Sequence, residues 1–418
     1  MKILYVVVAL SYSLFALVFV RESNVSPYVN YFIFLSSIII ISTNRINGKS
    51  LLIFICFLIF TLLNYFFAMQ ADLKHVFNVI GFAFVSLGAF TVGNNLKYHD
   101  DIKFQNLIRK NIVILVGVMS ALVVYALLQN INAPLLIIDL NFDKYFDLIL
   151  STPYGAMEAG FGNFVVFFAL ITILTYSKNK FRYNLFYITS LLLFIPLTLS
   201  HRSIIAALLL FLLIKYLIYK KLPMHIIIKP TFFVLTCIFI FIISDELWSF
   251  DRMSSILVSL DIASQNFFGT GVGGYEKYVL EGSDLLEKYG NELQFKAGAF
   301  WTSPESDLVN FIASWGVLGF IIYIFLIRIL HQCFKLLSDN KIKYTFDKLI
   351  IYFYMYLIFA GITSFKSNWV IWWLTFGLVS GVIYRINRDS NINILRNMSS
   401  HMPIVRQVEG QVLSNTKI

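Results

Sequence analysis

The chain has 418 residues, of which 58% are hydrophobic and only 13% are charged, and its mean hydropathy is +0.76. A soluble globular protein carries roughly a quarter charged residues, so this composition excludes a soluble protein and indicates an integral membrane protein. The chain has 33 basic and 23 acidic residues. In a membrane protein this surplus matters through its distribution across the bilayer, and we expect no nucleic-acid partner.

Twelve apolar runs are long enough to cross a bilayer as helices. A spanning helix needs about 20 mainly apolar residues, and fewer where Tyr, Trp or Lys anchors its ends. The runs lie near residues 3–20, 29–43, 50–68, 76–93, 112–129, 161–177, 183–199, 203–219, 226–244, 308–327, 349–365 and 368–384. The first run ends in "ALVFVRESN", which has no small-x-small cleavage site, so we expect it to stay as an anchor. The sequence predicts an all-α polytopic integral membrane protein with 12 transmembrane helices.

The basic residues are distributed unequally between the loops that these spans create. With the N-terminus in the cytoplasm, 24 of the 33 Lys and Arg residues lie on the inner side and nine on the outer side. Because inner loops are enriched in Lys and Arg, this asymmetry favours cytoplasmic N- and C-termini. The chain then divides into a membrane domain at 1–244, one large outer loop at 245–307, a second membrane domain at 308–384 and a cytoplasmic tail at 385–418.

A histidine and an arginine interrupt the apolar sequence in "LTLSHRSII", residues 197–205. The predicted topology places His201 and Arg202 in a short outer turn between two spans. An arginine near hydrocarbon is costly and needs water or a partner. Two alternatives stay open for Arg202: its side chain snorkels to the headgroups, or it binds a phosphate bidentately.

The outer loop at 245–307 is the longest polar stretch of the chain. Loops of more than about 12–15 residues are usually functional or disordered, and the aromatic residues of this loop argue against disorder. Among them are Trp248, Tyr275, Tyr278, Tyr289, Phe295, Phe300 and Trp301. We therefore place the working surface of the protein in this loop.

Three glycines in the loop match the dinucleotide-binding pattern G-x-G-x-x-G. They are Gly269, Gly271 and Gly274 in "GTGVGGYEKY". The pattern is meaningful only between a strand and a helix of a βαβ unit, and this segment lies in a loop of a membrane protein, so we reject nucleotide binding. The glycines instead permit positive φ and close backbone approach. A tight turn and a ligand contact both remain open.

The stretch "FWTSPESDLVNFIASWGVLGF", residues 300–320, begins a predicted helix at the outer surface. Pro304, followed by Glu305, Ser306 and Asp307, is typical of a helix N-terminus in both capping chemistry and charge. The two acids therefore have a structural explanation. A carboxylate at this position could also accept the proton of a sugar hydroxyl.

Three segments together resemble the O-antigen polymerase and O-antigen ligase superfamily of bacterial envelope enzymes, over nearly the full length of the chain. They are "LSHRSIIAALLLFL", "NFFGTGVGGYEKY" and "SPESDLVNFIASWGVLGF". The resemblance implies a protein of the bacterial inner membrane that acts at the periplasmic face. It implies transfer of glycan from undecaprenyl diphosphate to a sugar hydroxyl of a lipid-linked oligosaccharide, without cofactor or metal. Membrane lipid and a chain-length regulator protein are the other expected partners.

One departure from the family pattern bears on the choice between polymerase and ligase. Ligase-like members place a His-Asn pair at the start of the helix after the large loop, where this sequence has Glu305, Ser306 and Asp307. Polymerase is therefore the preferred function and ligase the alternative. A lipid-linked glycan flippase is a further alternative, but no matching Gly- or Pro-interrupted spans occur in the two halves of the chain.

The chemistry of the expected substrate assigns roles to particular residues. Cleavage of a glycosyl diphosphate leaves negative charge on the leaving group, which Arg202 is placed to stabilise. Glu305 or Asp307 is the expected base for the attacking hydroxyl. Aromatic rings offer flat faces for sugar rings, although core packing explains them nearly as well. The expected substrate-binding residues are His201, Arg252, Gly271, Gly274, Tyr275, Trp301 and Lys366.

Overall fold

The computed structural model describes only part of the chain. The described residues are 2, 4–10, 25–44, 46, 48–97, 102–107, 110, 117, 166–167, 170, 250–275, 277–278, 307–363 and 370–400. Regular structure within these ranges is entirely helical, and they contain no strand. This agrees with the all-α fold that the apolar runs predict. The spans expected at 112–129, 161–177, 183–199, 203–219 and 226–244 lie largely or wholly outside the described residues.

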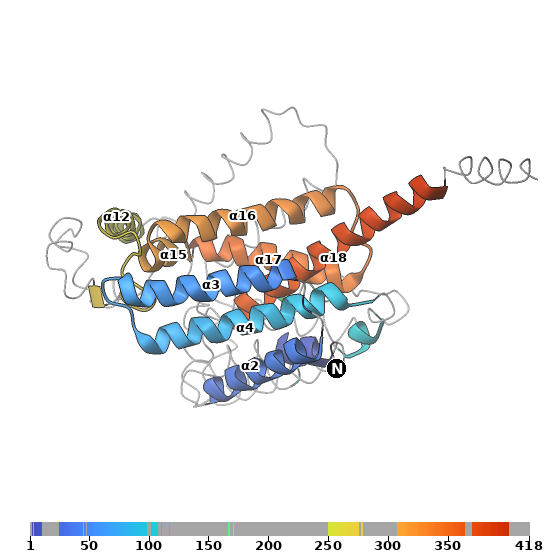
Figure 1. Ribbon diagram of the computed structural model, residues 1–418, viewed down its shortest axis with the longest axis horizontal. Helices are drawn as coiled ribbons and strands as arrows, with labels where there is room; N and C mark the ends of the chain where they lie inside the picture. Colours follow the sequence, from blue (N-terminus) through green and yellow to red (C-terminus); the bar gives the residue numbers. More distant parts are fainter. Residues whose placement is uncertain are drawn as a thin grey trace, which may run out of the picture.

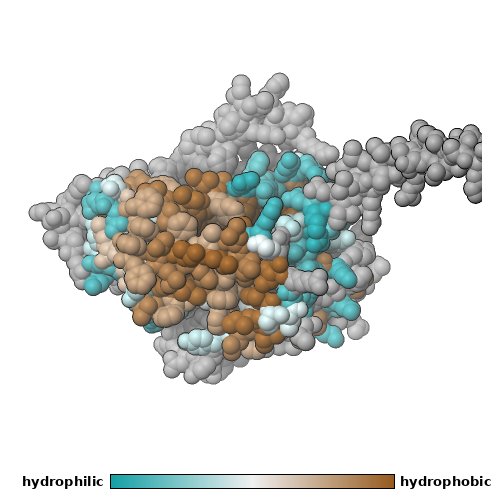
Figure 2. Space-filling model, viewed as in Figure 1, coloured by the Kyte–Doolittle hydropathy of each residue, from teal (hydrophilic) through white to brown (hydrophobic). Residues whose placement is uncertain are grey.

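The longest helices run alongside one another and form a bundle (Figure 1). The labelled helices are α2 (Val25–Thr43), α3 (Gly48–Phe67), α4 (Leu73–Asn95), α12 (Phe250–Gln265), α15 (Asp307–Trp315), α16 (Val317–Ser338), α17 (Thr345–Thr363) and α18 (Val370–Ser400). Within the described ranges, α3, α4, α16 and the part of α18 at Val370–Ser390 are long and apolar enough to cross a membrane. The protein is a helical membrane protein. Figure 2 shows the apolar band that these helices present between two hydrophilic ends.

Small residues bring α4 and α18 into close contact at the centre of the bundle. A Cβ on Gly377 or Gly381 would collide with a backbone carbonyl oxygen of α4, at Ser86 and Phe90 respectively. On the opposite helix, a Cβ on Gly93 would lie 2.6 Å from the carbonyl oxygen of Leu378. The spacing of Gly377 and Gly381 is the small-xxx-small pattern that lets membrane helices approach closely. Van der Waals packing along this seam stabilises the pair, because lipid offers no hydrophobic drive for helices to associate.

The span expected at 308–327 is wrong in its bounds, because a break at Gly316 divides that region into α15 and α16. Gly316 has φ +57°, a left-handed conformation that side chains rarely adopt. A Cβ at this position would also collide with the carbonyl oxygen of Phe267. The apolar run continues through the break, which is why hydrophobicity alone places a single helix there.

The two ends of the bundle differ in charge. One end comprises the turn at 68–72, the segment at 266–275 and the start of α15, and we call it the glycine end. The other end, which we call the basic end, comprises residues 96–97, 339–347 and 385–389. The described basic residues there and on the adjoining helix turns are Lys97, Lys103, Lys335, Lys341, Lys343, Lys348, Arg385 and Arg388. Three described basic residues lie in elements that adjoin the glycine end: Lys74 in the first turn of α4, Arg252 in α12, and Lys277 just after residue 275.

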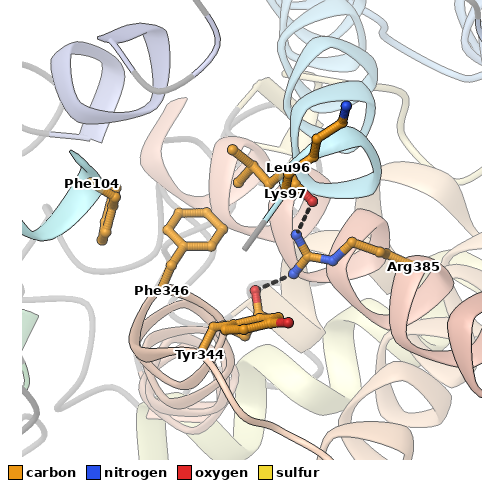
Figure 3. Close-up of a pocket in the computed structure, with 7 residues that line it drawn as sticks. Leu96, Lys97, Phe104, Tyr344, Phe346 and Arg385 are labelled. Atoms are coloured by element: carbon orange, nitrogen blue, oxygen red, sulfur yellow. Dashed lines mark hydrogen bonds and ion pairs between the residues drawn. The ribbon is translucent and has the colours of Figure 1, made fainter. Parts of the chain in front are cut away.

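A buried arginine joins three helices at the basic end (Figure 3). Arg385 of α18 donates from Nη1 to the carbonyl oxygen of Leu96 at 2.9 Å, and through Nη2 it pairs with Asp347 of α17. Leu96 is the C-cap of α4, so the guanidinium satisfies a carbonyl that has no partner within its own helix. Phe104 and Phe346 pack edge to face beside it, with ring centroids 4.6 Å apart. We call Arg385, Asp347 and Leu96 the arginine clamp.

The arginine clamp should contribute strongly to stability. Asp347→Asn leaves the buried Arg385 without its counter-charge, and breaking a buried ion pair by removing one partner costs about 3–5 kcal/mol. We expect a marked fall in the thermal unfolding midpoint of the protein in detergent. Asp389→Asn is the matched control, because its pair with Arg388 at 3.2 Å is exposed and is worth about 0–1 kcal/mol. Equal midpoints for the two variants would contradict a stabilising role for the clamp.

Candidate functional site

The glycine-rich segment at 266–275 pairs with the turn between α3 and α4. The backbone amides of Gln70 and Asp72 donate to the carbonyl oxygens of Thr270 and Val272, at 2.8 and 3.0 Å. The segment is about 200 residues away from this turn in sequence, yet it covers the turn with backbone hydrogen bonds. An interior segment of the predicted outer loop is therefore attached to the N-terminal part of the bundle.

The same segment fills the break between α15 and α16. The amide of Thr270 donates to the carbonyl oxygen of Ala313 at 2.8 Å, and the amide of Val317 donates to the carbonyl oxygen of Phe267 at 3.1 Å. One of these bonds satisfies a carbonyl at the end of α15, and the other satisfies an amide at the start of α16. Groups at helix termini need such partners, most of all near a membrane.

Gly271 and Gly274 approach the α3–α4 turn so closely that a side chain would not fit. Gly271 has φ +90°, and a Cβ there would lie 2.6 Å from the Cβ of Ala71. A Cβ on Gly274 would collide with the carbonyl oxygen of Gln70. These contacts correspond to the turn-packing alternative for the glycines. A contact of either glycine with substrate stays a prediction.

Asn64 holds the site together from inside α3. It is fully buried, and its side-chain Nδ2 donates to the carbonyl oxygens of Phe268 and Ser314 at 2.8 and 2.9 Å. Its Oδ1 accepts from the amide of Val272 at 3.0 Å. One side chain therefore bonds α3 to the glycine-rich segment and to the end of α15. Sequence reasoning missed Asn64, although a polar amide inside the apolar run at 50–68 was a usable signal.

Tyr275 lies in a small hydrophobic core that joins α12 to α15. Its ring is 2% exposed and packs with Val258, Ile262, Val309 and Ala313. This is the core-packing alternative for the aromatic residues of the loop, and it leaves little of the ring open to a sugar. The α12 helix also shows that part of the predicted loop at 245–307 is regular structure.

Asp307 begins α15 and is 3% exposed. Its carboxylate lies against Gly361 of α17, where a Cβ would collide with Oδ2. An acid in the first turn of a helix is favoured by the helix dipole. The position of Asp307 therefore agrees with the structural explanation, and its burial leaves little of the carboxylate open to a substrate hydroxyl.

The remaining expected residues are placed only in part. Arg252 belongs to α12, near the same end of the bundle. His201, Arg202, Trp301, Glu305 and Lys366 lie outside the described residues. The structure thus brings Gly271, Gly274, Tyr275 and Asp307 to one end of the bundle, and the roles of Arg202 and Glu305 rest on the sequence.

A histidine and an aspartate pair at the surface of this end. Asp72 is the N-cap of α4, and its Oδ1 accepts from the amide of Lys74 at 3.0 Å. Its Oδ2 lies 2.5 Å from Nδ1 of His75, and the two side chains are 44% and 42% exposed. The hydrogen bond from His75 lowers the pKa of Asp72. Sequence reasoning missed this pair as well. The described residues contain no group of three or more His, Cys, Asp or Glu side chains that could hold a metal ion.

Comparison with known proteins gives no assignment: no protein-family model, no curated protein and no solved structure matches this chain.

The hydrogen bonds of Asn64 should be essential for holding the segment at 266–275 and the end of α15 against α3. Asn64→Leu fills a similar volume but leaves two buried carbonyls and one amide without partners, each at a cost of about 1–3 kcal/mol. We expect a lower thermal midpoint and faster proteolysis within 266–275 for the protein in detergent.

Thr61→Val is the matched control for this substitution. Thr61 is also buried in α3, but its hydroxyl donates only to Phe57 of its own helix, at 2.9 Å. The control should therefore resemble the wild type. If Asn64→Leu resisted protease as well as Thr61→Val, Asn64 would not hold the segment in place.

Proposed function

We propose that the protein is a surface-polysaccharide polymerase of the O-antigen polymerase type, a glycosyltransferase of the bacterial inner membrane. It transfers glycan from undecaprenyl diphosphate to a sugar hydroxyl of a lipid-linked repeat unit at the periplasmic face. The observation that carries this proposal is the contact between two of the segments that resemble the superfamily. Residues 266–275 and α15 meet through the bond from Thr270 to Ala313.

The position of this contact suits an enzyme that works on lipid-linked sugars. It lies at one end of the apolar band, the level at which a carrier in the bilayer and its glycan in water would meet (Figures 1 and 2). Eight described basic residues lie at or next to the basic end, and three lie next to the glycine end. This distribution supports a periplasmic location for the glycine end, because Lys and Arg concentrate on the cytoplasmic side.

The reaction needs a cation for the leaving group and an acceptor for one proton. Arg202 is the proposed cation, because its planar fork matches a phosphate bidentately and stabilises the charge that develops on the diphosphate. Arg252 and Lys366 are further candidates on the same side. No cofactor takes part in the proposed reaction, since the diphosphate is itself a good leaving group.

The break between α15 and α16 is the feature that has to be weighed for the alternative function, a flippase or other transporter. Discontinuous helices often form substrate sites in transporters, where their free ends face a cavity at the bilayer midplane. Here, however, Thr270 and Phe267 of the chain itself bond to the free ends, and the break lies at the end of the bundle. A break filled by the protein's own backbone supports the polymerase proposal over transport.

Surface glycan from a strain that lacks the gene tests the proposed reaction. We expect core capped by a single repeat unit, and complementation by the wild-type gene should restore long chains. Arg202→Lys should restore few or none while the protein still accumulates in the membrane, since an ammonium cannot reproduce the bidentate fork. Polymer that accumulates on the carrier would instead identify a ligase, and repeat units retained on the cytoplasmic face would identify a flippase. Normal chain length with Arg202→Lys would leave Arg202 as a snorkelling anchor.

The proposed orientation predicts opposite labelling of the two ends. Ser264 at the end of α12 and Ser338 at the end of α16 are both exposed. Each is replaced singly by cysteine in a protein from which Cys56, Cys237 and Cys333 have been removed. An impermeant thiol reagent applied to cells with a permeable outer membrane should label position 264, and position 338 only after the inner membrane is opened. The reverse pattern would place the glycine end in the cytoplasm.

A further inference from the structure

The strongest unassigned chemistry in the described residues is the pair formed by Asp72 and His75 at the glycine end. An ionised carboxylate can only accept hydrogen bonds, so the proton between Asp72 Oδ2 and His75 lies on Nδ1 of the imidazole. The lowered pKa of Asp72 keeps its carboxylate ionised. In the neutral ring, Nε2 then carries the lone pair and points away from Asp72.

A second segment holds the imidazole from another direction. Gly273 has φ +77°, and a Cβ on it would lie 2.5 Å from Cγ of His75. The backbone at Gly273 therefore packs directly against the ring. Two neighbouring bonds, from Gln70 to Thr270 and from Asp72 to Val272, fix this backbone to the turn. The ring is oriented both by a carboxylate and by packing, yet 42% of the side chain stays exposed.

Helix capping does not explain the histidine. Asp72 already caps α4 through its bond from the amide of Lys74, which uses the other carboxylate oxygen. An exposed ion pair contributes little to stability, about 0–1 kcal/mol. An oriented imidazole with one nitrogen bonded to a carboxylate and the other not hydrogen-bonded to any described residue is instead the arrangement of a general base.

We propose that His75, oriented by Asp72, is the general base that removes the proton of the acceptor hydroxyl at the glycine end. This inference rests on the proposed function, and it gives to His75 the role that the sequence alone assigns to Glu305 or Asp307. Asp72 is a positioning residue, because it acts on the reaction only through the imidazole.

The proton and the electrons balance in a single transfer. Nε2 of His75 takes the hydroxyl proton as the acceptor oxygen forms a bond to the anomeric carbon of the donor. The bond between that carbon and the diphosphate oxygen breaks, and undecaprenyl diphosphate leaves with the electron pair. The imidazolium, stabilised by Asp72, then releases its proton to water. No oxidant, metal or further reactant is needed.

Chain extension in proteoliposomes tests this assignment. The substrate is undecaprenyl-diphosphate-linked repeat units extracted from the strain that lacks the gene. His75→Gln should lower the extension rate on the order of 10²–10⁴-fold, because an amide takes up no proton at working pH. Its thermal midpoint should stay close to that of the wild type. His331→Gln, the same change at an exposed position of α16 towards the basic end, should extend chains normally.

Asp72→Asn separates a catalytic role of the pair from a structural one. Asn caps a helix about as well as Asp, so α4 keeps its N-terminus. Without the carboxylate the imidazolium that forms in the reaction loses its counter-charge, so kcat should fall while KM stays close to the wild-type value.

Three results would overturn the assignment. They are a normal extension rate for His75→Gln, an unchanged kcat for Asp72→Asn, and a thermal midpoint of His75→Gln so low that the variant is unfolded under the assay conditions. Failure of the proposed function itself looks different, because the strain that lacks the gene would then make normal surface glycan. A normal rate for His75→Gln together with a null rate for Glu305→Gln would return the base to the glutamate.

Discussion

The backbone groups at the break between α15 and α16 must be hydrogen-bonded, and the arrangement of the glycine end depends on how that requirement is met. Water is scarce near the hydrocarbon region, and an unpaired amide or carbonyl there costs several kcal/mol. The chain meets the requirement with its own segment at 266–275, which bonds to Ala313 and Val317 across the break. Asn64 adds a bond to Ser314 and fixes the segment on its other side. A break that could have been a cavity is therefore solid protein.

This solution explains why so many glycines gather at one end. A backbone segment that bonds to a helix break on one side and to the α3–α4 turn on the other must pass very close to both. Gly269 and Gly316 meet across the break, and Gly271 and Gly273 lie on the turn. Each has positive φ, which glycine adopts at no steric cost. The dense packing then presents the Asp72–His75 pair on its outer surface as a rigid feature.

The two ends of the bundle use different polar chemistry for the same structural purpose. At the basic end a charged side chain, Arg385, satisfies the last carbonyl of α4 and is neutralised by Asp347. At the glycine end a neutral amide, Asn64, makes three bonds to backbone. Between them α4 and α18 pack through small residues, among them Gly93, Gly377 and Gly381. A core held at both ends and packed closely along its length is a suitable support for the site that we propose at the glycine end.

The sequence by itself determined the fold class, the positions of most described helices and the uneven distribution of charge. Apolar runs near 50–68, 76–93 and 349–365 correspond closely to α3, α4 and α17, because hydrophobic length is a local property that the bilayer selects. The run at 368–384 corresponds to the first part of α18, which continues to Ser400 through the first residues of the predicted tail. The sequence also indicated that the glycine-rich segment and the start of α15 belong to the same surface.

Only the tertiary structure decided the break at Gly316, the role of Asn64 and the packing of His75 against Gly273, which lies about 200 residues further along the chain. Hydrophobicity does not change across the break, so no local pattern reveals it. The bonds of Asn64 join residues that are more than 200 positions apart. Such partners meet only after the helices have packed, because a hydrogen bond depends on distance in space and a sequence records only distance along the chain.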